Sequence, residues 1–274
     1  VYLFLQNPIL YRPKQFILMD NTVLEKAKKW TSEQFDAETR ESVRNLIDSN
    51  LEELTESFYK DLEFGTGGLR GIMGVGTNRI NIYTVGMATQ GLANYLKQSF
   101  DGDINVAIAH DSRNNSPLFA RKTAEVFAAN GIKAYLFSSL RPTPELSFAI
   151  RYLGCKSGVV ITASHNPKEY NGYKAYWQDG GQLVAPHDKN VITEVQKIVG
   201  PQDVKWNAPD SLIEMIDENL DTAYIAGLKS LCLSPEAVKA QSDLKIVFTS
   251  LHGTGGTMVP RTLKELGFAN VSTV

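Results

Sequence analysis

The chain has 274 residues, of which 43% are hydrophobic, a length and composition that suit one large or two ordinary globular domains. Its 28 basic and 30 acidic residues leave a net charge of −2, so its overall charge would not draw it to nucleic acid or to an anionic membrane. The two cysteines, Cys155 and Cys232, are far apart and lack metal-ligand spacing, so we expect reduced packing residues of a cytoplasmic protein.

The first residues form two short apolar runs, which Pro8, Arg12 and Pro13 interrupt. A membrane helix needs about 20 consecutive apolar residues, and a secretory signal needs a basic start and a small-residue cleavage site. Neither pattern is present. Because Met19 resembles a natural start, we expect residues 1–18 to be non-native or an over-extended N-terminus.

A helix is predicted next. Ser49 with Glu52 three residues later is typical of a capping box. Apolar residues then recur at spacings of three and four: Leu51, Leu54, Phe58 and Leu62. They predict that one face of this helix is buried. The charged residues between them indicate that the opposite face is exposed to solvent.

A glycine-rich loop follows at residues 64–71, with the sequence Phe-Gly-Thr-Gly-Gly-Leu-Arg-Gly. Its spacing fits neither the G-x-G-x-x-G of a dinucleotide site nor a nucleotide P-loop. Glycines let a backbone approach a ligand closely, and the guanidinium of Arg70 matches phosphate oxygens. The alternative, without any resemblance, is that Arg70 is a surface residue beside a flexible turn.

From residue 104 strands and helices alternate. The expected strands are 104–109, 132–137 and 159–161, and the expected helices are 117–130 and 144–153. Such alternation gives parallel strands joined by right-handed crossovers. We therefore expect residues 110–113 and 138–144 to lie on the same rim of the sheet as Ser164. Arg141 is expected to support this rim, and the role of His110 stays open.

Ser164 follows the buried run from Val159 to Ile161, at the carboxyl end of a strand, where open α/β sheets bind ligands. A serine there could be a nucleophile, a phosphate carrier or a turn former. His165 is adjacent, but neighbouring side chains diverge and the G-x-S-x-G elbow of serine hydrolases is missing.

The last part of the sequence predicts a second α/β unit. A helix is expected at 186–198, a linker at 201–210, and helical structure over 211–240. A strand at 244–249, a helix at 259–266 that ends at Gly267, and a strand from Asn270 complete the pattern.

Three of these segments together resemble one family. Thr162-Ala-Ser-His-Asn-Pro167 followed by Asn171-Gly-Tyr-Lys174 resembles the phosphoserine loop of the α-D-phosphohexomutases, which include phosphoglucomutases and phosphomannomutases. Residues 64–71 resemble the family's arginine loop, and His110-Asp-Ser-Arg113 resembles its next motif. The loop at His252 is also similar to a family motif.

This resemblance implies two similar α/β domains, with mixed, mainly parallel sheets and helices on both faces, in a family of four-domain proteins. The first domain would span residues 19–200, the linker 201–210, and an incomplete second domain 211–274. The family's Asp-Gly-Asp-x-Asp-Arg metal loop, its sugar-selecting loop and its phosphate clamp do not occur in this sequence. We accordingly expect a truncated N-terminal portion that is inactive alone.

The resemblance also implies a mechanism, in which a phosphorylated serine gives its phosphoryl group to a sugar monophosphate and regains one from the resulting 1,6-bisphosphate. The implied catalytic residues are Ser164, His165, Lys174 and Arg70, and the implied substrate or phosphate ligands are Asn166, Arg113, Thr66 and Gly67. Ser164 would also bind Mg²⁺ through its phosphate.

The substrate would be a phosphosugar. Tyr176-Trp177 and residues 186–189 are similar to the phosphoglucomutase and phosphopentomutase branch, which favours glucose phosphate over mannose phosphate. A non-catalytic sugar-phosphate-binding paralogue is the alternative.

Overall fold

The computed structural model describes residues 21–274, so the expectation for residues 1–18 lies outside the described residues. The helices are α1 (Asn21–Lys29), α2 (Ala37–Ser49), α3 (Leu51–Phe58), α4 (Ile82–Ser99), α5 (Ser116–Ala129), α6 (Thr143–Tyr152), α7 (His187–Gln196), α8 (Glu218–Ser230), α9 (Pro235–Ala240) and α10 (Met258–Leu266). The strands are β1 (Gly68–Ile72), β2 (Asn105–His110), β3 (Lys133–Phe137), β4 (Ser157–Ile161), β5 (Tyr170–Trp177), β6 (Ile213–Ile216), β7 (Lys245–Phe248) and β8 (Asn270–Thr273).

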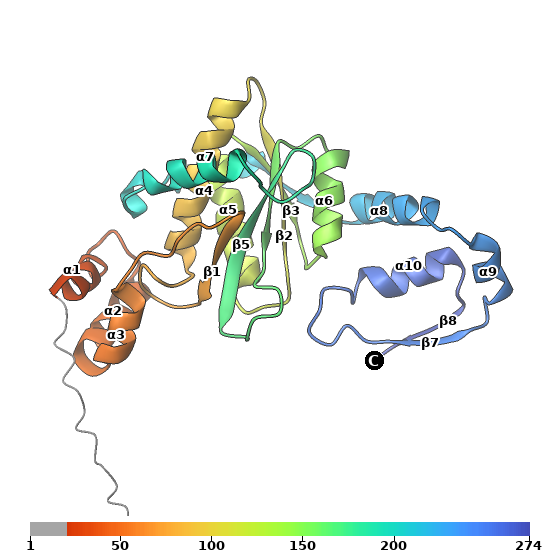
Figure 1. Cartoon of the computed structure of the whole chain (residues 1–274), viewed down its shortest axis with the longest axis horizontal. Helices are drawn as coiled ribbons and strands as arrows, with labels where there is room; N and C mark the ends of the chain where they lie inside the picture. The colour runs from red at the N-terminus through yellow and green to blue at the C-terminus, as the bar shows by residue number, and fades with distance from the viewer. Residues whose placement is uncertain (1–20) are drawn as a thin grey trace, which may run out of the picture.

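The central sheet has six strands in the order β1-β5-β4-β2-β3-β6 (Figure 1). β2 pairs in parallel with β3 and β4, and β3 pairs in parallel with β6. β5 runs antiparallel to both of its neighbours, β1 and β4. The sheet is thus mixed and mainly parallel, as the family resemblance implies, and the predicted strands and helices between residues 104 and 161 are confirmed within two residues at each end.

Helices cover both faces of this sheet. Alternate residues of β2 separate cleanly, because Val106 and Ile108 pack with α4, α5 and α7 while Ala107 and Ala109 pack with α6 and α8. Both faces of β2 are therefore buried, which explains why its sequence is continuously apolar. The α/β/α architecture expected from the sequence is confirmed, and it places the carboxyl ends of β2 and β4 at one edge.

The N-terminal helices form a separate apolar cluster against the start of α4, in which Trp30 and Phe35 stack with ring centroids 4.5 Å apart. The predicted capping box at Ser49 is wrong. Ser49 still belongs to α2, and its hydroxyl donates to the carbonyl of Asn45, whereas Asn50 caps α3 by accepting the N–H of Glu53. α3 also ends at Phe58, so Leu62 lies beyond the predicted helix face.

The segment after α7 differs from the helical structure expected over 211–240. Residues 213–216 form β6, which extends the central sheet beside β3, and α8 begins at Glu218. Within the expected linker, Trp206 packs against Gly86 of α4 and Tyr83. The separation into two domains at this segment stays a prediction.

The last elements lie to one side of the central sheet (Figure 1). β7 and β8 pair in parallel, and α10 joins them, ending at Gly267 in the left-handed conformation (φ 119°) as predicted. Between residues 21 and 274, no helix combines the length and the apolar character needed to cross a bilayer.

Candidate active site

Ser164 lies on an exposed turn three residues after β4. Its backbone is left-handed, with φ 59°, a conformation that a residue other than glycine rarely adopts. Its N–H donates to the hydroxyl oxygen of Thr162 at 3.0 Å, and its own hydroxyl oxygen lies 3.4 Å from Nδ1 of His165. The turn therefore presents the serine side chain outward while its backbone is held from below.

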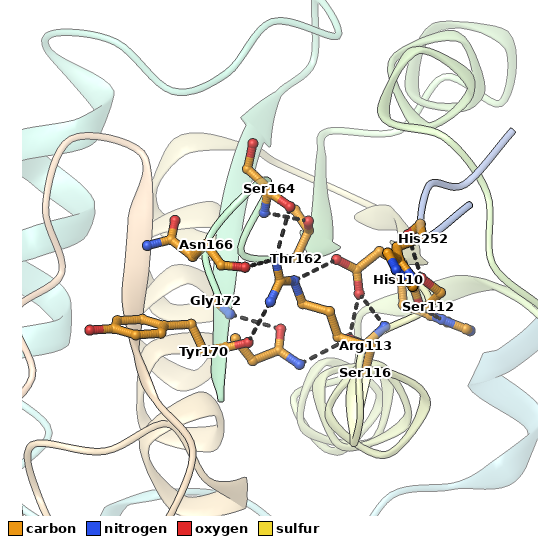
Figure 2. Close-up of polar contacts among 12 residues, drawn as sticks. His110, Ser112, Arg113, Ser116, Thr162, Ser164, Asn166, Tyr170, Gly172 and His252 are labelled. Atoms are coloured by element: carbon orange, nitrogen blue, oxygen red, sulfur yellow. Dashed lines mark hydrogen bonds and ion pairs between the residues drawn. The ribbon is translucent and has the colours of Figure 1, made fainter. Parts of the chain in front are cut away.

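Arg113 holds this turn from inside (Figure 2). Its guanidinium donates to four backbone carbonyls: Ser164 (2.9 Å), Asn166 (2.6 Å), Pro167 (2.8 Å) and Tyr170 (3.0 Å). Its Nε lies 3.3 Å from Oδ2 of Asp111, and the side chain is only 12% exposed. Because all five N–H donors face protein acceptors, the geometry favours support of the loop over the phosphate contact expected for Arg113.

Asp111 ties the loop to the start of α5. Its Oδ1 accepts the hydroxyl of Ser116 at 2.7 Å and the backbone N–H of Arg113 at 3.0 Å. Asn171, which is fully buried, donates from Nδ2 to the oxygen of the same Ser116 hydroxyl at 2.9 Å. The ends of β2 and β4 and the start of β5 are therefore joined by one buried polar network. No role in such a network was predicted for Asp111 or Asn171 from the sequence.

Arg70 and Lys174 come from adjacent strands. Arg70 pairs with Gly172 in the β1–β5 register, and Lys174 pairs with Val160 in the β4–β5 register. Residues two apart on a strand share a face, so both cations project on the face of Val160. Arg70 donates to Oδ1 of Asn166 at 3.1 Å, whereas within residues 21–274 the Lys174 ammonium has no hydrogen-bond or ion-pair partner.

Partial burial lowers the pKa of Lys174 below its usual value, and the nearby positive charge of Arg70 lowers it further. We predict that Arg70→Met raises the pKa of Lys174, because it removes the repulsive charge and leaves burial in place. Titration of ¹³C-labelled lysine side chains would show this shift, and Arg44→Met, at an exposed arginine of α2, is the control. An unchanged Lys174 titration would contradict the coupling of the two cations.

The glycine-rich loop lies directly against β5. Gly67 accepts the N–H of Ala175 at 2.9 Å, while Thr66 stands exposed at the tip of the turn. At Gly68, where φ is 153°, an added Cβ would lie 1.8 Å from the carbonyl oxygen of Tyr173. Only glycine fits at position 68, so this close approach fixes the position of Arg70 beside Lys174.

The rim predicted from the sequence forms one hollow of about 240 Å³. Its lining combines the predicted segments with the last part of the chain: Asp111, Arg141, Thr143, Val160, Thr162, Ser164, His165, His252, Gly253 and Thr254. The hydroxyl of Ser112 donates to the carbonyl of His252 at 2.9 Å (Figure 2), which brings the His252 loop to the rim. His110 is buried, with Nδ1 2.9 Å from the carbonyl oxygen of Asp111.

A larger cavity of about 650 Å³ lies away from the serine loop, between α7 and the segment around Phe64, and none of the predicted site residues lines it. The smaller hollow is lined by Ser164, His165 and Arg141, so its chemistry makes it the candidate site, while Arg70 and Lys174 lie outside its lining.

The described residues do not by themselves form a Mg²⁺ site. Residues 21–274 contain no group of three His, Cys, Asp or Glu side chains that could hold a metal ion. Asp111, the carboxylate that lines the hollow, already accepts hydrogen bonds from Arg113 and Ser116. Mg²⁺ binding through a phosphate on Ser164 stays a prediction.

Known proteins resemble the chain at the level of sequence and of structure. Residues 61–200 match the family model described as phosphoglucomutase/phosphomannomutase, alpha/beta/alpha domain I. A phosphoglucomutase of Staphylococcus haemolyticus is 40% identical over 85% of this chain and 42% of its own length. A phosphopentomutase of Homo sapiens is 37% identical over 82% of this chain and 39% of its own length.

A crystal structure of a putative phosphomannomutase from Thermus thermophilus superposes with a TM-score of 0.67 and 27% identity, over 78% of this chain and 46% of that one. The chain thus spans about two fifths of the length of the curated relatives it matches. The matched domain I includes the arginine loop, the His110 motif and the serine loop, which are the three motifs that carry the resemblance. The chain belongs to the phosphoglucomutase/phosphomannomutase family.

Proposed function

We propose that this chain carries the phosphoserine side of a phosphosugar mutase site, with Ser164 as the phosphoryl carrier. The observation that supports this most is the exposed Ser164 hydroxyl on a rigidly held turn, beside a cationic face and a hollow. Phosphoryl transfer depends on positioning and on neutralising negative charge more than on covalent help from the protein. A fixed serine next to Arg70 and Lys174 meets both needs.

Each cation has its own role in this proposal. Arg70 is exposed on β1 and reaches the serine loop through Asn166, so its guanidinium would neutralise charge on the transferring phosphoryl group. Lys174 has a lowered pKa, so it exchanges a proton with a sugar hydroxyl more readily than an ordinary lysine, and its charged form also stabilises phosphate. His165 would assist at the Ser164 oxygen, from which its Nδ1 is 3.4 Å.

The remaining predicted ligands surround this centre. Asn166 would position the substrate together with Arg70, and Thr66 and Gly67 would present hydroxyl and backbone groups to a phosphate. We assign Arg113 to holding the loop, since its donors are already engaged. Mg²⁺, if bound at a phosphate on Ser164, supplies further positive charge against the phosphoryl oxygens.

The proposed substrates are hexose or pentose monophosphates, with a sugar 1,6-bisphosphate as primer and intermediate, and we favour glucose phosphate. We further propose a cytoplasmic protein with neither nucleic acid nor a membrane as partner, in accord with its net charge of −2.

A coupled assay tests this function. The protein that carries this chain is given glucose 1-phosphate, mannose 1-phosphate or ribose 1-phosphate, each with and without glucose 1,6-bisphosphate. The expected result is isomerisation that depends on the primer and is fastest with glucose 1-phosphate. Tight binding of sugar phosphate without any turnover would instead favour the non-catalytic paralogue, and the absence of both would overturn the proposal.

A further inference from the structure

Glu145 is the most unusual buried group outside the serine loop. It lies in the first turn of α6, its exposed fraction is 0%, and neither carboxyl oxygen has a hydrogen-bond donor when the group is ionised. Arg141 does not satisfy it, because its Nε is 3.9 Å from Oε2 of Glu145, beyond hydrogen-bond distance. A buried carboxylate without donors is costly, so the structure favours its neutral form.

Asp221 of α8 is the neighbour that stabilises the neutral form of Glu145. Arg141 grips Asp221 with two parallel hydrogen bonds, from Nε and from Nη2, each 2.9 Å long. After burial, Asp221 is the neighbour that raises the pKa of Glu145, by hydrogen bonding and by its charge, and two carboxyl groups can hydrogen-bond to each other only when one of them carries a proton. Because Asp221 already faces a guanidinium, the proton belongs on Glu145.

Other charges around the pair balance it. Arg261 of α10 reaches toward Asp221, with Nη1 3.7 Å from Oδ2, and donates to Glu218 at 2.7 Å and 3.0 Å. Asp217, just before α8, lies 3.5 Å from Nη2 of Arg141, and Tyr224 of α8 interacts electrostatically with Glu145. One proton on Glu145 keeps the buried cluster near neutrality.

We infer that Glu145 and Asp221 form a carboxyl–carboxylate pair that shares one proton and, with Arg141, fastens α8 to α6, and that loss of this proton to solvent loosens the contact. The contact matters for the hollow, because Arg141 lines it and its backbone N–H donates to the carbonyl of His110. α8 begins the part of the chain that carries His252 to the same rim. The pair would thus set how the His252 loop meets the serine loop.

The pH dependence has a definite sign. Burial, and then the hydrogen bond with Asp221, raise the pKa of Glu145 from 4.5 to about 8. Between these values the folded chain binds more protons than the unfolded chain, so this group stabilises the fold fully at low pH and loses its contribution as the pH rises toward 8. Asp221 has a lowered pKa, so its own contribution is lost only in acid.

Amide hydrogen exchange of α8 at pH 6.5 and pH 9 tests the inference, with protection factors corrected for intrinsic exchange. In the wild type, we expect protection in α8 to fall by about tenfold or more at pH 9. Glu145→Gln cannot ionise and can still donate to Asp221, so its α8 protection should stay constant. Glu56→Gln, at an exposed carboxylate of α3, should behave as the wild type. The same loss of protection in Glu145→Gln would overturn the inference.

A second measurement does not depend on the variant folding. In wild-type protein labelled with ¹³C at glutamate carboxyls, we expect one resonance to titrate near pH 8, far above the ordinary carboxyl range. If every glutamate resonance titrates below pH 6, Glu145 is ionised in the folded protein and the shared-proton pair does not exist.

Discussion

In the protein that carries this chain, Ser164→Ala is expected to lower primed phosphosugar isomerisation by more than about 1000-fold, because it removes the oxygen that we propose as the phosphoryl carrier. The fold should not change. The N–H of residue 164 can still donate to Thr162, and the backbone carbonyl still meets Arg113. The measurement is the rate of glucose 6-phosphate formation from glucose 1-phosphate with a bisphosphate primer.

Ser99→Ala is the matched control, because Ser99 is an exposed serine at the end of α4 that contacts only a helix carbonyl. It should retain the wild-type rate. If Ser164→Ala also retains most of the rate, another group carries the phosphoryl group. In that case the proposed role of the serine loop is wrong.

Arg113→Lys should destabilise the protein by about 2–4 kcal/mol and abolish ordering of the serine loop. A lysine ammonium has three donors at one point, and it cannot reproduce the planar fork that reaches four carbonyls and the carboxylate of Asp111. Chemical denaturation would measure the stability. Hydrogen exchange of residues 164–170 would report the loop.

Arg121→Lys is its control, since Arg121 is a half-exposed arginine of α5 that pairs with Glu125, and we expect less than about 0.5 kcal/mol there. The outcome also separates two roles for Arg113. If Arg113→Lys binds inorganic phosphate more weakly but keeps its stability and its loop protection, Arg113 contacts phosphate directly, as the motif resemblance implies.

Three of the six strands of the sheet, β2, β3 and β4, could be predicted from the sequence, because they are apolar runs separated by well-bounded helices. β1 and β5 could not, because their residues were expected to belong to the glycine-rich loop and the serine loop. Nor could β6. Its four residues include exposed Glu214 and Met215, so only pairing with β3 makes them a strand. α4 was also missed, since Gly86 and Gly91 weaken a helical pattern. Their lack of a side chain allows Trp206 and Val195 to pack closely.

The site shows the same division. One local motif contains both Ser164 and Lys174, and the pairing of β5 with β1 and β4 explains why Arg70 joins Lys174 on one face. The partners of Arg113 and Arg141 could not be predicted from the residues next to them in the sequence. Arg113 meets carbonyls more than fifty residues away, and Arg141 meets Asp221 eighty residues away. Such partners follow from how strands and helices assemble, which is why the motif suggested a phosphate ligand at Arg113.

The most direct test of the account is peptide mass spectrometry of the protein after incubation with glucose 1,6-bisphosphate. The account predicts a single phosphate, located on Ser164 and absent from Ser164→Ala. Bound bisphosphate with no phosphate on Ser164, or a phosphate on a different residue, would contradict the claim that this serine is the phosphoryl carrier.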